Sequence, residues 1–241
     1  MLKRTFTVLA ATLALLVPAT AAFASIPPHP KWESAELNGQ WNDGGYLFQN
    51  DMWNCPQAAC GKQTIWANSS SDWGVVSTMA AGNTAVLTYP NLGQVYGDQP
   101  ISHFKQVSDN FTESMPRSIK GLSAEAANDV WLNNYKIEMM IWVDNIGRSL
   151  AGSTRVGSAT IFGQQFSVWK YGNSEFIFDL NHNETSGSTH ILASIAWLVQ
   201  HGQVPAGPEL TQAEFGWEIA STGGQAASFS MSKYALISRT R

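Results

Sequence analysis

The chain has 241 residues, of which only 13% are charged, and its formal net charge is -4. It also contains 10 Trp, 6 Tyr and 11 Phe residues. The negative net charge and the lack of a Lys/Arg cluster argue against a nucleic-acid-binding surface. This composition is typical of a secreted all-β protein that handles a neutral ligand.

The first 24 residues have the pattern of an export signal. Lys3 and Arg4 form a basic start, residues 6–17 are apolar, and residues 22–24 give the small-x-small sequence of a signal peptidase site. The apolar run is shorter than the roughly 20 residues that span a bilayer. We therefore predict a signal peptide over 1–24 and a single domain over 25–241. The mature protein should be extracellular, with no membrane attachment.

The mature sequence consists of short apolar-polar alternations separated by Gly, Asn, Asp and Ser, which predicts many β-strands. The expected strands are 45–50, 63–68, 74–79, 85–89, 101–107, 130–131 leading into 136–143, 156–161, 166–171, 175–180, 212–220 and 229–237. Many short strands with turn residues between them favour an antiparallel sandwich of two sheets.

One segment has a helical spacing instead. Apolar residues recur every three to four positions in 189–201, and Gly202 follows as a stop signal. Ser188 or Thr189 is expected to cap the start of this helix. A single helix packed on the outside of the sandwich is the interpretation that fits.

The two cysteines, Cys55 and Cys60, lie in one short segment. An exported protein can oxidise such a pair, so we predict a disulfide that stiffens one loop. No His or acidic residue lies between them, which argues against a metal site. We expect neither a metal nor another cofactor.

Two segments place acidic residues on strands beside aromatic residues. In 136–143 strict alternation puts Glu138, Met140 and Trp142 on one face. In 214–219 it puts Glu214 and Glu218 on the face opposite the apolar residues. Two such acids are what cleavage of a sugar polymer requires, because retaining hydrolysis uses a nucleophile and an acid/base about 5–5.5 Å apart. Neighbouring strands of a curved sheet hold side chains at this order of separation. The alternative is that each Glu is simply a solvated residue of a half-exposed strand.

Four motifs resemble those of glycoside hydrolase family 12 and occur in the family's order. Residues 138–142 are similar to its nucleophile strand, Glu-x-Met-Ile-Trp, and residues 215–218, followed by Gly223–Gly224, to its acid/base strand. Residues 128–132 resemble its Tyr-Asp-hydrophobic-aromatic strand, and residues 46–53 its N-terminal strand ending in Asn-Asn-x-Trp. Together they span most of the mature chain.

The resemblance implies a β-jelly roll of two packed sheets with a groove on the concave one. It also implies a secreted retaining endo-β-1,4-glucanase. Glu138 matches the nucleophile, Glu218 the acid/base, and Asp129 an acidic partner close enough to hydrogen-bond the nucleophile. Glu214 shares the face of Glu218, but only Glu218 stands at the family's spacing before the Gly pair.

The same resemblance suggests which residues contact the sugar. Met140 and Trp142 share the face of Glu138 and should line the groove. Trp53 matches an aromatic platform, and Trp41 is a second candidate; packing in the core is the alternative for both. The remaining expected substrate-binding residues are Asn50, Asp51 and Asn173.

Departures from the family leave the substrate open. Residues 148–153 lack the prolines of the family loop, Ile219 and Ala220 follow the acid/base position, and Asn128 replaces a Tyr. Cellulose, mixed-linkage glucan and xyloglucan all remain candidates, with a polysaccharide as the partner and a monomer as the expected state. A non-catalytic carbohydrate-binding jelly roll and a retaining xylanase are the rival interpretations.

Overall fold

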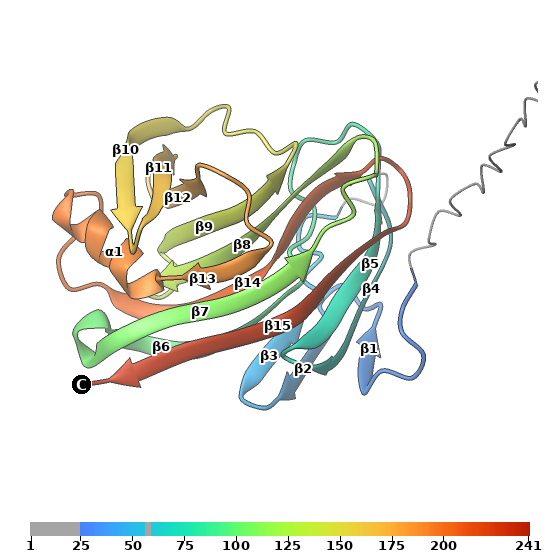
Figure 1. The fold of residues 1–241 in the computed structure, drawn as a ribbon, viewed down its shortest axis with the longest axis horizontal. Helices are drawn as coiled ribbons and strands as arrows, with labels where there is room; N and C mark the ends of the chain where they lie inside the picture. Colours follow the sequence, from blue (N-terminus) through green and yellow to red (C-terminus); the bar gives the residue numbers. More distant parts are fainter. Residues whose placement is uncertain (1–24, 56–58) are drawn as a thin grey trace, which may run out of the picture.

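The computed structural model describes residues 25–55 and 59–241, so the predicted signal peptide lies outside the described residues. Two β-sheets pack face to face (Figure 1), as predicted. The smaller sheet has the order β1 (Trp32–Ser34), β4 (Cys60–Ser69), β5 (Asp72–Met79), β15 (Ala227–Thr240), β7 (Phe104–Ser114), β13 (Ser186–Thr189). The larger has the order β10 (Thr154–Ile161), β11 (Gln164–Tyr171), β12 (Glu175–Leu180), β9 (Ile137–Ile146), β8 (Leu122–Leu132), β14 (Glu209–Thr222), β6 (Asn91–Pro100), β3 (Tyr46–Gln49), β2 (Gln40–Asp43). Only β12 and β9 pair in parallel among these strands.

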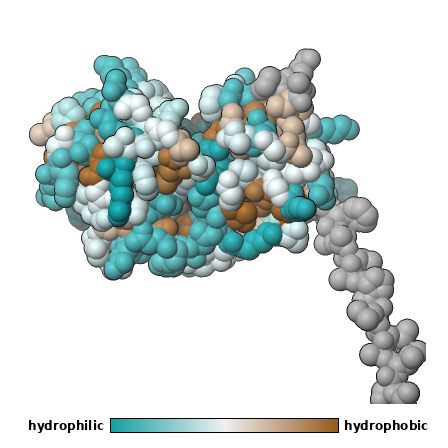
Figure 2. All heavy atoms as spheres, turned by 90° about the horizontal axis from the view of Figure 1, so that it is seen from above, coloured by the Kyte–Doolittle hydropathy of each residue, from teal (hydrophilic) through white to brown (hydrophobic). Residues whose placement is uncertain are grey.

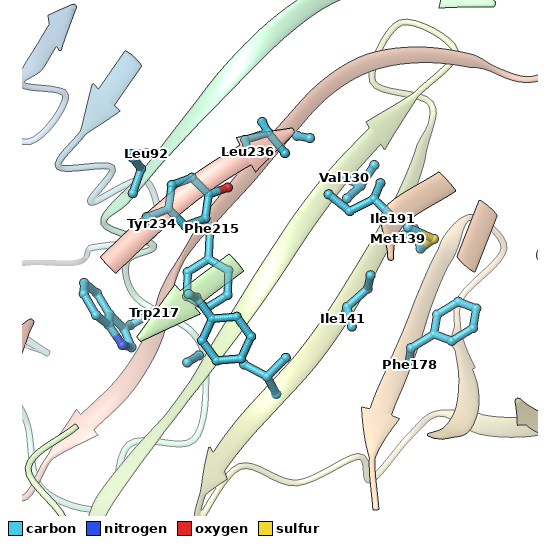
Figure 3. Close-up of a cluster of buried hydrophobic side chains, with 14 of the residues drawn as sticks. Leu92, Val130, Met139, Ile141, Phe178, Ile191, Phe215, Trp217, Tyr234 and Leu236 are labelled. Carbon is cyan, nitrogen blue, oxygen red and sulfur yellow. The ribbon is translucent and has the colours of Figure 1, made fainter. Parts of the chain in front are cut away.

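The hydrophobic core lies between the two sheets and follows from the alternation in the sequence. Phe215 and Trp217 of β14 and Ile141 of β9 are fully buried. Phe215 stacks on Phe111 of the opposite sheet with ring centroids 5.0 Å apart, and Trp217 packs on Trp73 at 4.8 Å. Figure 3 shows part of this layer. Each such side chain contributes about 1.5–3 kcal/mol by leaving water, which holds β14 and β9 in a single orientation.

The predicted helix is present as α1 (Ile191–Gln200), and Gly202, at φ +65°, follows its end. The predicted capping was wrong. His190 precedes the helix and makes no capping hydrogen bond through its side chain. The Thr189 hydroxyl instead lies 2.8 Å from Asp109 and 2.6 Å from Asn128, in a buried polar network between the sheets. Ser188 donates to Asn110.

The strands differ from the prediction in several places. Residues 85–89 form only an isolated bridge, from Thr88 to Ile219, and residues 101–103 form a short 3-10 helix. Strands β1, β2, β6 and β13 were not predicted. Strand β6 is polar and contains Gly93, where a Cβ would lie 2.4 Å from the Ala213 carbonyl oxygen. Strand β14 therefore approaches so closely that only a glycine fits at this position. A glycine within a segment argues against a strand when the sequence is read locally, which is why β6 was not predicted.

Cys55 and Cys60 form the predicted disulfide, with Cα atoms 5.6 Å apart. It links the loop that carries Trp53 to the start of β4. Across residues 25–55 and 59–241, no helix is long and apolar enough to cross a membrane.

A pair of acidic side chains is buried between the sheets. Glu113 of β7 accepts a hydrogen bond from Trp217 Nε1 at 3.0 Å, and its other oxygen has no partner apart from the neighbouring Asp144 carboxyl. Arg117 forms an ion pair with Asp144. Burial, and after it the negative charge of Asp144, raise the pKa of Glu113 to about 8. The proton on Glu113 removes one of the two negative charges, so that the carboxyl groups of Glu113 and Asp144 can be buried side by side.

Replacing Glu113 by Gln should therefore stabilise the protein at alkaline pH, because the amide has the shape of the protonated acid. The pKa of Glu113 is raised from 4.5 to about 8, so its contribution to stability is complete below pH 4.5 and is lost as pH rises through 8. We expect the free energy of unfolding, measured with urea between pH 5 and pH 9, to fall less in Glu113→Gln. The difference should be on the order of a few kcal/mol at the alkaline end. Identical pH dependences in the two proteins would contradict this.

Candidate active site

Three adjacent strands of the larger sheet, β9, β8 and β14, carry the acidic residues on the face turned away from the core. Glu138 of β9 lies opposite Trp131 of β8. Asp129 of β8 lies between Met140 of β9 and Glu214 of β14. We expected Glu138 and Glu218 to lie on neighbouring strands. This was wrong, because β8 lies between β9, which carries Glu138, and β14, which carries Glu218.

Two adjoining hollows lie over these strands, with volumes of about 400 Å³ and about 290 Å³. The space-filling view shows the molecule hollowed between two lobes (Figure 2). Three residues line both hollows: Trp53, Glu138 and Glu218. The two acids singled out from the sequence are therefore brought together where the hollows meet.

The two hollows differ in their remaining walls. The first is lined by Thr84, Ala85, Val86, Trp142, Arg148, Leu150, Tyr171, Glu175 and Ile177, among others. The second is lined by Asp51, Tyr89, Asp129, Trp131 and Glu214. Aromatic rings and acidic groups thus line both hollows, which suits a neutral sugar chain with many hydroxyl groups.

Two acidic side chains of the groove, Glu138 and Asp129, have raised pKa values. Burial, followed by the charges of Glu175 and Glu218, raises the pKa of Glu138 to about 8. Burial, and then the charge of Glu138, raise the pKa of Asp129 well above its ordinary value. Because each negative charge increases the proton affinity of its neighbours, these groups do not all ionise together at neutral pH.

Asp129 was expected to hydrogen-bond the nucleophile, Glu138. The hydrogen bond that the structure gives it comes instead from Trp131, whose Nε1 donates to Oδ2 at 3.1 Å. Oδ1 of Asp129 has no hydrogen-bond partner among the described residues. Among the described residues, Asp129 therefore makes no hydrogen bond to Glu138.

Glu214 also reaches the groove, in the wall of the second hollow. Its Oε1 accepts a hydrogen bond from Gln49 at 2.6 Å and another from Gln212. Burial, and then the charge of Asp51, raise the pKa of Glu214 to about 8. These amide contacts fix Glu214 in the wall, whereas Glu218 lies at the junction.

The expected sugar-contacting residues fall into two groups. Trp53, 61% exposed, and Asp51 line the groove, and burial raises the pKa of Asp51 to about 6. Trp142 lines the first hollow, and Met140 packs with it on the groove side of the sheet. Trp53, Asp51 and Trp142 therefore line the hollows, whereas Met140 is buried beneath them and lines neither.

Three other expectations are corrected. Asn50 is completely buried, donates to the Glu36 carbonyl at 2.8 Å and accepts from Gln63, so it supports the fold and does not face the groove. Trp41 packs on Phe48 of the core and stacks on Trp32. Asn173 is exposed in the turn between β11 and β12 and lines neither hollow.

The sequence reasoning missed Glu125, Arg148, Glu175 and Tyr89. Glu125 lies four residues before Asp129 on the same strand, so alternation alone would have placed it on the groove face. Tyr89 donates from its hydroxyl to the Ala127 carbonyl at 3.0 Å, a contact between segments far apart in sequence. Arg148 lies in a loop, and no periodic pattern indicates where a loop side chain will point.

No group of three or more His, Cys, Asp and Glu side chains in the described parts of the chain is arranged to hold a metal ion.

No protein-family model matches the chain. A probable xyloglucan-specific endo-β-1,4-glucanase A from Neosartorya fischeri is 23% identical over 171 residues, which cover 66% of this chain and 68% of that protein. The xyloglucanase domain of NopAA from Sinorhizobium fredii, solved with cellobiose, superposes with a TM-score of 0.75 at 22% identity, covering 88% of this chain and all of that one.

A native family 12 xyloglucanase from Bacillus licheniformis also superposes with a TM-score of 0.75 at 22% identity, covering 86% of this chain and all of that one. The family 12 endoglucanase 3 of Trichoderma harzianum gives a TM-score of 0.74 at 19% identity, over 86% of this chain and 97% of that one. The chain has the fold of the family 12 glycoside hydrolases. The resemblance drawn from the four motifs, and the jelly roll that it implied, are confirmed at the level of the fold.

The different surroundings of Trp53 and Trp41 predict opposite effects of their removal. Trp53→Ala should leave the unfolding midpoint unchanged and weaken binding of a cello-oligosaccharide about tenfold, or ~1.4 kcal/mol. Trp41→Ala should lower the free energy of unfolding by about 2 kcal/mol through lost packing and leave binding by the folded protein unchanged. Isothermal titration calorimetry and urea denaturation on both variants would separate the two effects. Weakened binding in Trp41→Ala alone would reverse the assignment.

Proposed function

We propose that the chain is a secreted retaining endo-β-1,4-glucanase that hydrolyses internal bonds of xyloglucan and related soluble β-glucans. The observation that carries the proposal is the position of Glu138 and Glu218, which both line the two hollows at their junction. The relative from N. fischeri is named as xyloglucan-specific, and two of the solved relatives as xyloglucanases, which makes xyloglucan the first substrate to test.

The shape of the site favours attack within a polymer. Hollows extend to both sides of the acid pair, so a sugar chain can lie across it with residues bound on each side. Trp53 borders both hollows and offers an exposed ring to the sugar faces. A monomer suffices for this function, since one chain supplies every residue named here.

In the first step, Glu138 attacks the anomeric carbon and Glu218 transfers a proton to the leaving oxygen. In the free groove a proton resides on the acid cluster, where the pKa of Glu138 is held at about 8 by burial and its acidic neighbours. The positive charge that develops on the sugar stabilises the ionised form of Glu138, which is in contact with it. The proton that Glu138 gives up is then held by Glu218, which transfers it to the leaving oxygen. No extra proton has to enter the groove.

In the second step, the covalent ester formed by Glu138 removes its negative charge from the cluster. Glu218, now ionised, accepts a proton from a water molecule that attacks the anomeric carbon and releases Glu138. Two inversions at the same carbon leave the β-configuration unchanged.

Export of the protein rests on residues 1–24, which have the basic, apolar and small-x-small regions of a signal peptide. The disulfide between Cys55 and Cys60 accords with an oxidising compartment.

Rescue by azide would assign the two acids separately. Glu138→Ala and Glu218→Ala should each lower hydrolysis of xyloglucan by at least ~10²–10⁴-fold. With an aryl β-glycoside, azide should restore turnover of both variants. It should give the α-glycosyl azide in Glu138→Ala, where it replaces the nucleophile, and the β-glycosyl azide in Glu218→Ala. Product analysis by NMR distinguishes them.

A Glu33→Gln variant provides the control, because Glu33 is an exposed carboxyl on β1 of the opposite sheet. It should retain wild-type activity on xyloglucan, barley β-glucan and carboxymethyl cellulose. Exchange of the two azide products would exchange the roles of the acids. Binding without hydrolysis by wild type and variants alike would identify a carbohydrate-binding module instead, and preference for xylan would identify a xylanase.

A further inference from the structure

Glu218 has a second acidic neighbour that the hydrolytic mechanism above does not use. Glu125 of β8 lies directly opposite Glu218 of β14 in the sheet. Its side chain is completely buried, and Oε1 has no hydrogen-bond partner among the described residues other than the adjacent Glu218 carboxyl. Two like charges at directly opposite positions destabilise a sheet, so a proton or a cation must lie between them.

Arg148 supplies that cation. Its Nε donates to Glu125 Oε2 at 2.6 Å, its Nη2 lies 3.5 Å from Glu218 Oε2, and its Nη1 donates to the Thr84 carbonyl at 3.0 Å. The guanidinium also lies over the ring of Trp142, 5.9 Å from its centroid. Only 11% of the side chain is exposed. The arginine is therefore held from four directions.

The backbone of Arg148 is fixed as well. Its N–H donates to the Asn145 side chain at 3.0 Å, just after Gly147, which turns the chain at φ +73°. At this glycine a Cβ would lie 2.7 Å from the Leu122 carbonyl oxygen, so the loop approaches β8 closely. The loop thus presents the guanidinium in one orientation.

We propose that Glu125 and Arg148 are positioning residues for Glu218. Glu125 and Glu218 form a carboxyl pair that shares a proton, and the guanidinium of Arg148 bridges the two. This proposal rests on the acid/base role given to Glu218 above. One positive charge faces two carboxyl groups. When Glu125 carries a proton, the guanidinium is free to neutralise Glu218. When Glu125 is ionised, it competes with Glu218 for that charge.

This arrangement serves the interval between the two chemical steps. After Glu218 has given its proton to the leaving oxygen, its carboxylate and that of Glu125 both face the guanidinium of Arg148, whose positive charge offsets their repulsion. The water that attacks next returns a proton to Glu218, and the pair regains its starting state. No proton is created or lost over the two steps. Burial, and then the charge of Glu218, raise the pKa of Glu125 well above its ordinary value, which accords with this role.

Other titratable groups face Glu218 and set the background against which the pair acts. They are Asp129 of β8, Glu138 of β9, Glu175 of β12 and Tyr89 of the segment before β6. All are acidic or neutral, and among the described residues Arg148 is the one basic side chain that lines either hollow. Changing Arg148 therefore removes the positive charge nearest to Glu218.

The test is the pH dependence of kcat/KM on xyloglucan for Glu125→Gln and Arg148→Gln. Without the charge of Glu125, Glu218 should lose its proton more readily, and the alkaline limb should move to lower pH. Without the charge of Arg148, Glu218 should hold its proton longer, and the same limb should move to higher pH. Each shift should be on the order of one pH unit, as expected for a charge within 4–6 Å of a carboxyl. Arg148→Lys should reverse part of the second shift.

Two control variants separate this role from a structural one. Glu113→Gln changes the other buried carboxyl pair, and Arg155→Gln removes an exposed arginine bonded to Ser158. Both should leave the alkaline limb in place. Shifts in the same direction for Glu125→Gln and Arg148→Gln, or limbs that coincide with wild type, would overturn the proposal.

A second readout does not depend on hydrolysis. In protein labelled with ¹³C at the Glu carboxyl groups, the Glu218 resonance should titrate at lower pH in Glu125→Gln than in wild type. If this shift is seen but the protein hydrolyses no glucan, the proposed carboxyl pair is supported and the proposed enzymatic function is rejected. Hydrolysis by wild type with an unchanged titration would do the reverse. The measurement also decides the question if Arg148→Gln does not fold.

Discussion

The site depends on the register between β14 and β8. Phe215 and Trp217 face the core, and Glu214 and Glu218 therefore face the groove. A shift of one residue would turn the acids into the core and the aromatic rings into the groove, which the cost of burying unpaired charges forbids. Packing of Trp217 on Trp73 and of Phe215 on Phe111 thus determines where the carboxyl groups stand. The hydrophobic core positions the chemistry.

On each face of the larger sheet, two carboxyl groups lie close together beside one arginine. Between the sheets, Glu113 and Asp144 share a site next to Arg117. On the groove face, Glu125 and Glu218 share one next to Arg148. In each case one acid carries a proton and one arginine supplies the positive charge. The difference is access: only the second pair borders a hollow that a ligand can enter.

The loop between β9 and β10 is held in place by side-chain hydrogen bonds. Residues 148–153 lack the prolines that the family resemblance led us to expect. Here the loop is ordered by Asn145, which bonds the Arg148 backbone, and by Arg148, which bonds Glu125 and the Thr84 carbonyl. Side-chain hydrogen bonds therefore hold this loop in place without proline. Low identity to the solved relatives, 19–22%, accompanies a shared fold because apolar alternation, rather than particular residues, specifies the two sheets.

The sequence by itself determined the faces of β9 and β14, the helical stripe of α1, the disulfide and the two acids at the junction, because alternation and spacing are local properties of the chain. It did not determine that β8 lies between the strands of Glu138 and Glu218, since strand order is a nonlocal property. It also placed Asn50 at the groove, whereas packing buries this side chain against Glu36 and Gln63. For Trp41 the sequence left core packing open, and the contacts with Phe48 and Trp32 decide for it. The pairing of Glu125 with Glu218, bridged by a loop arginine, exists only once three separate segments have packed together.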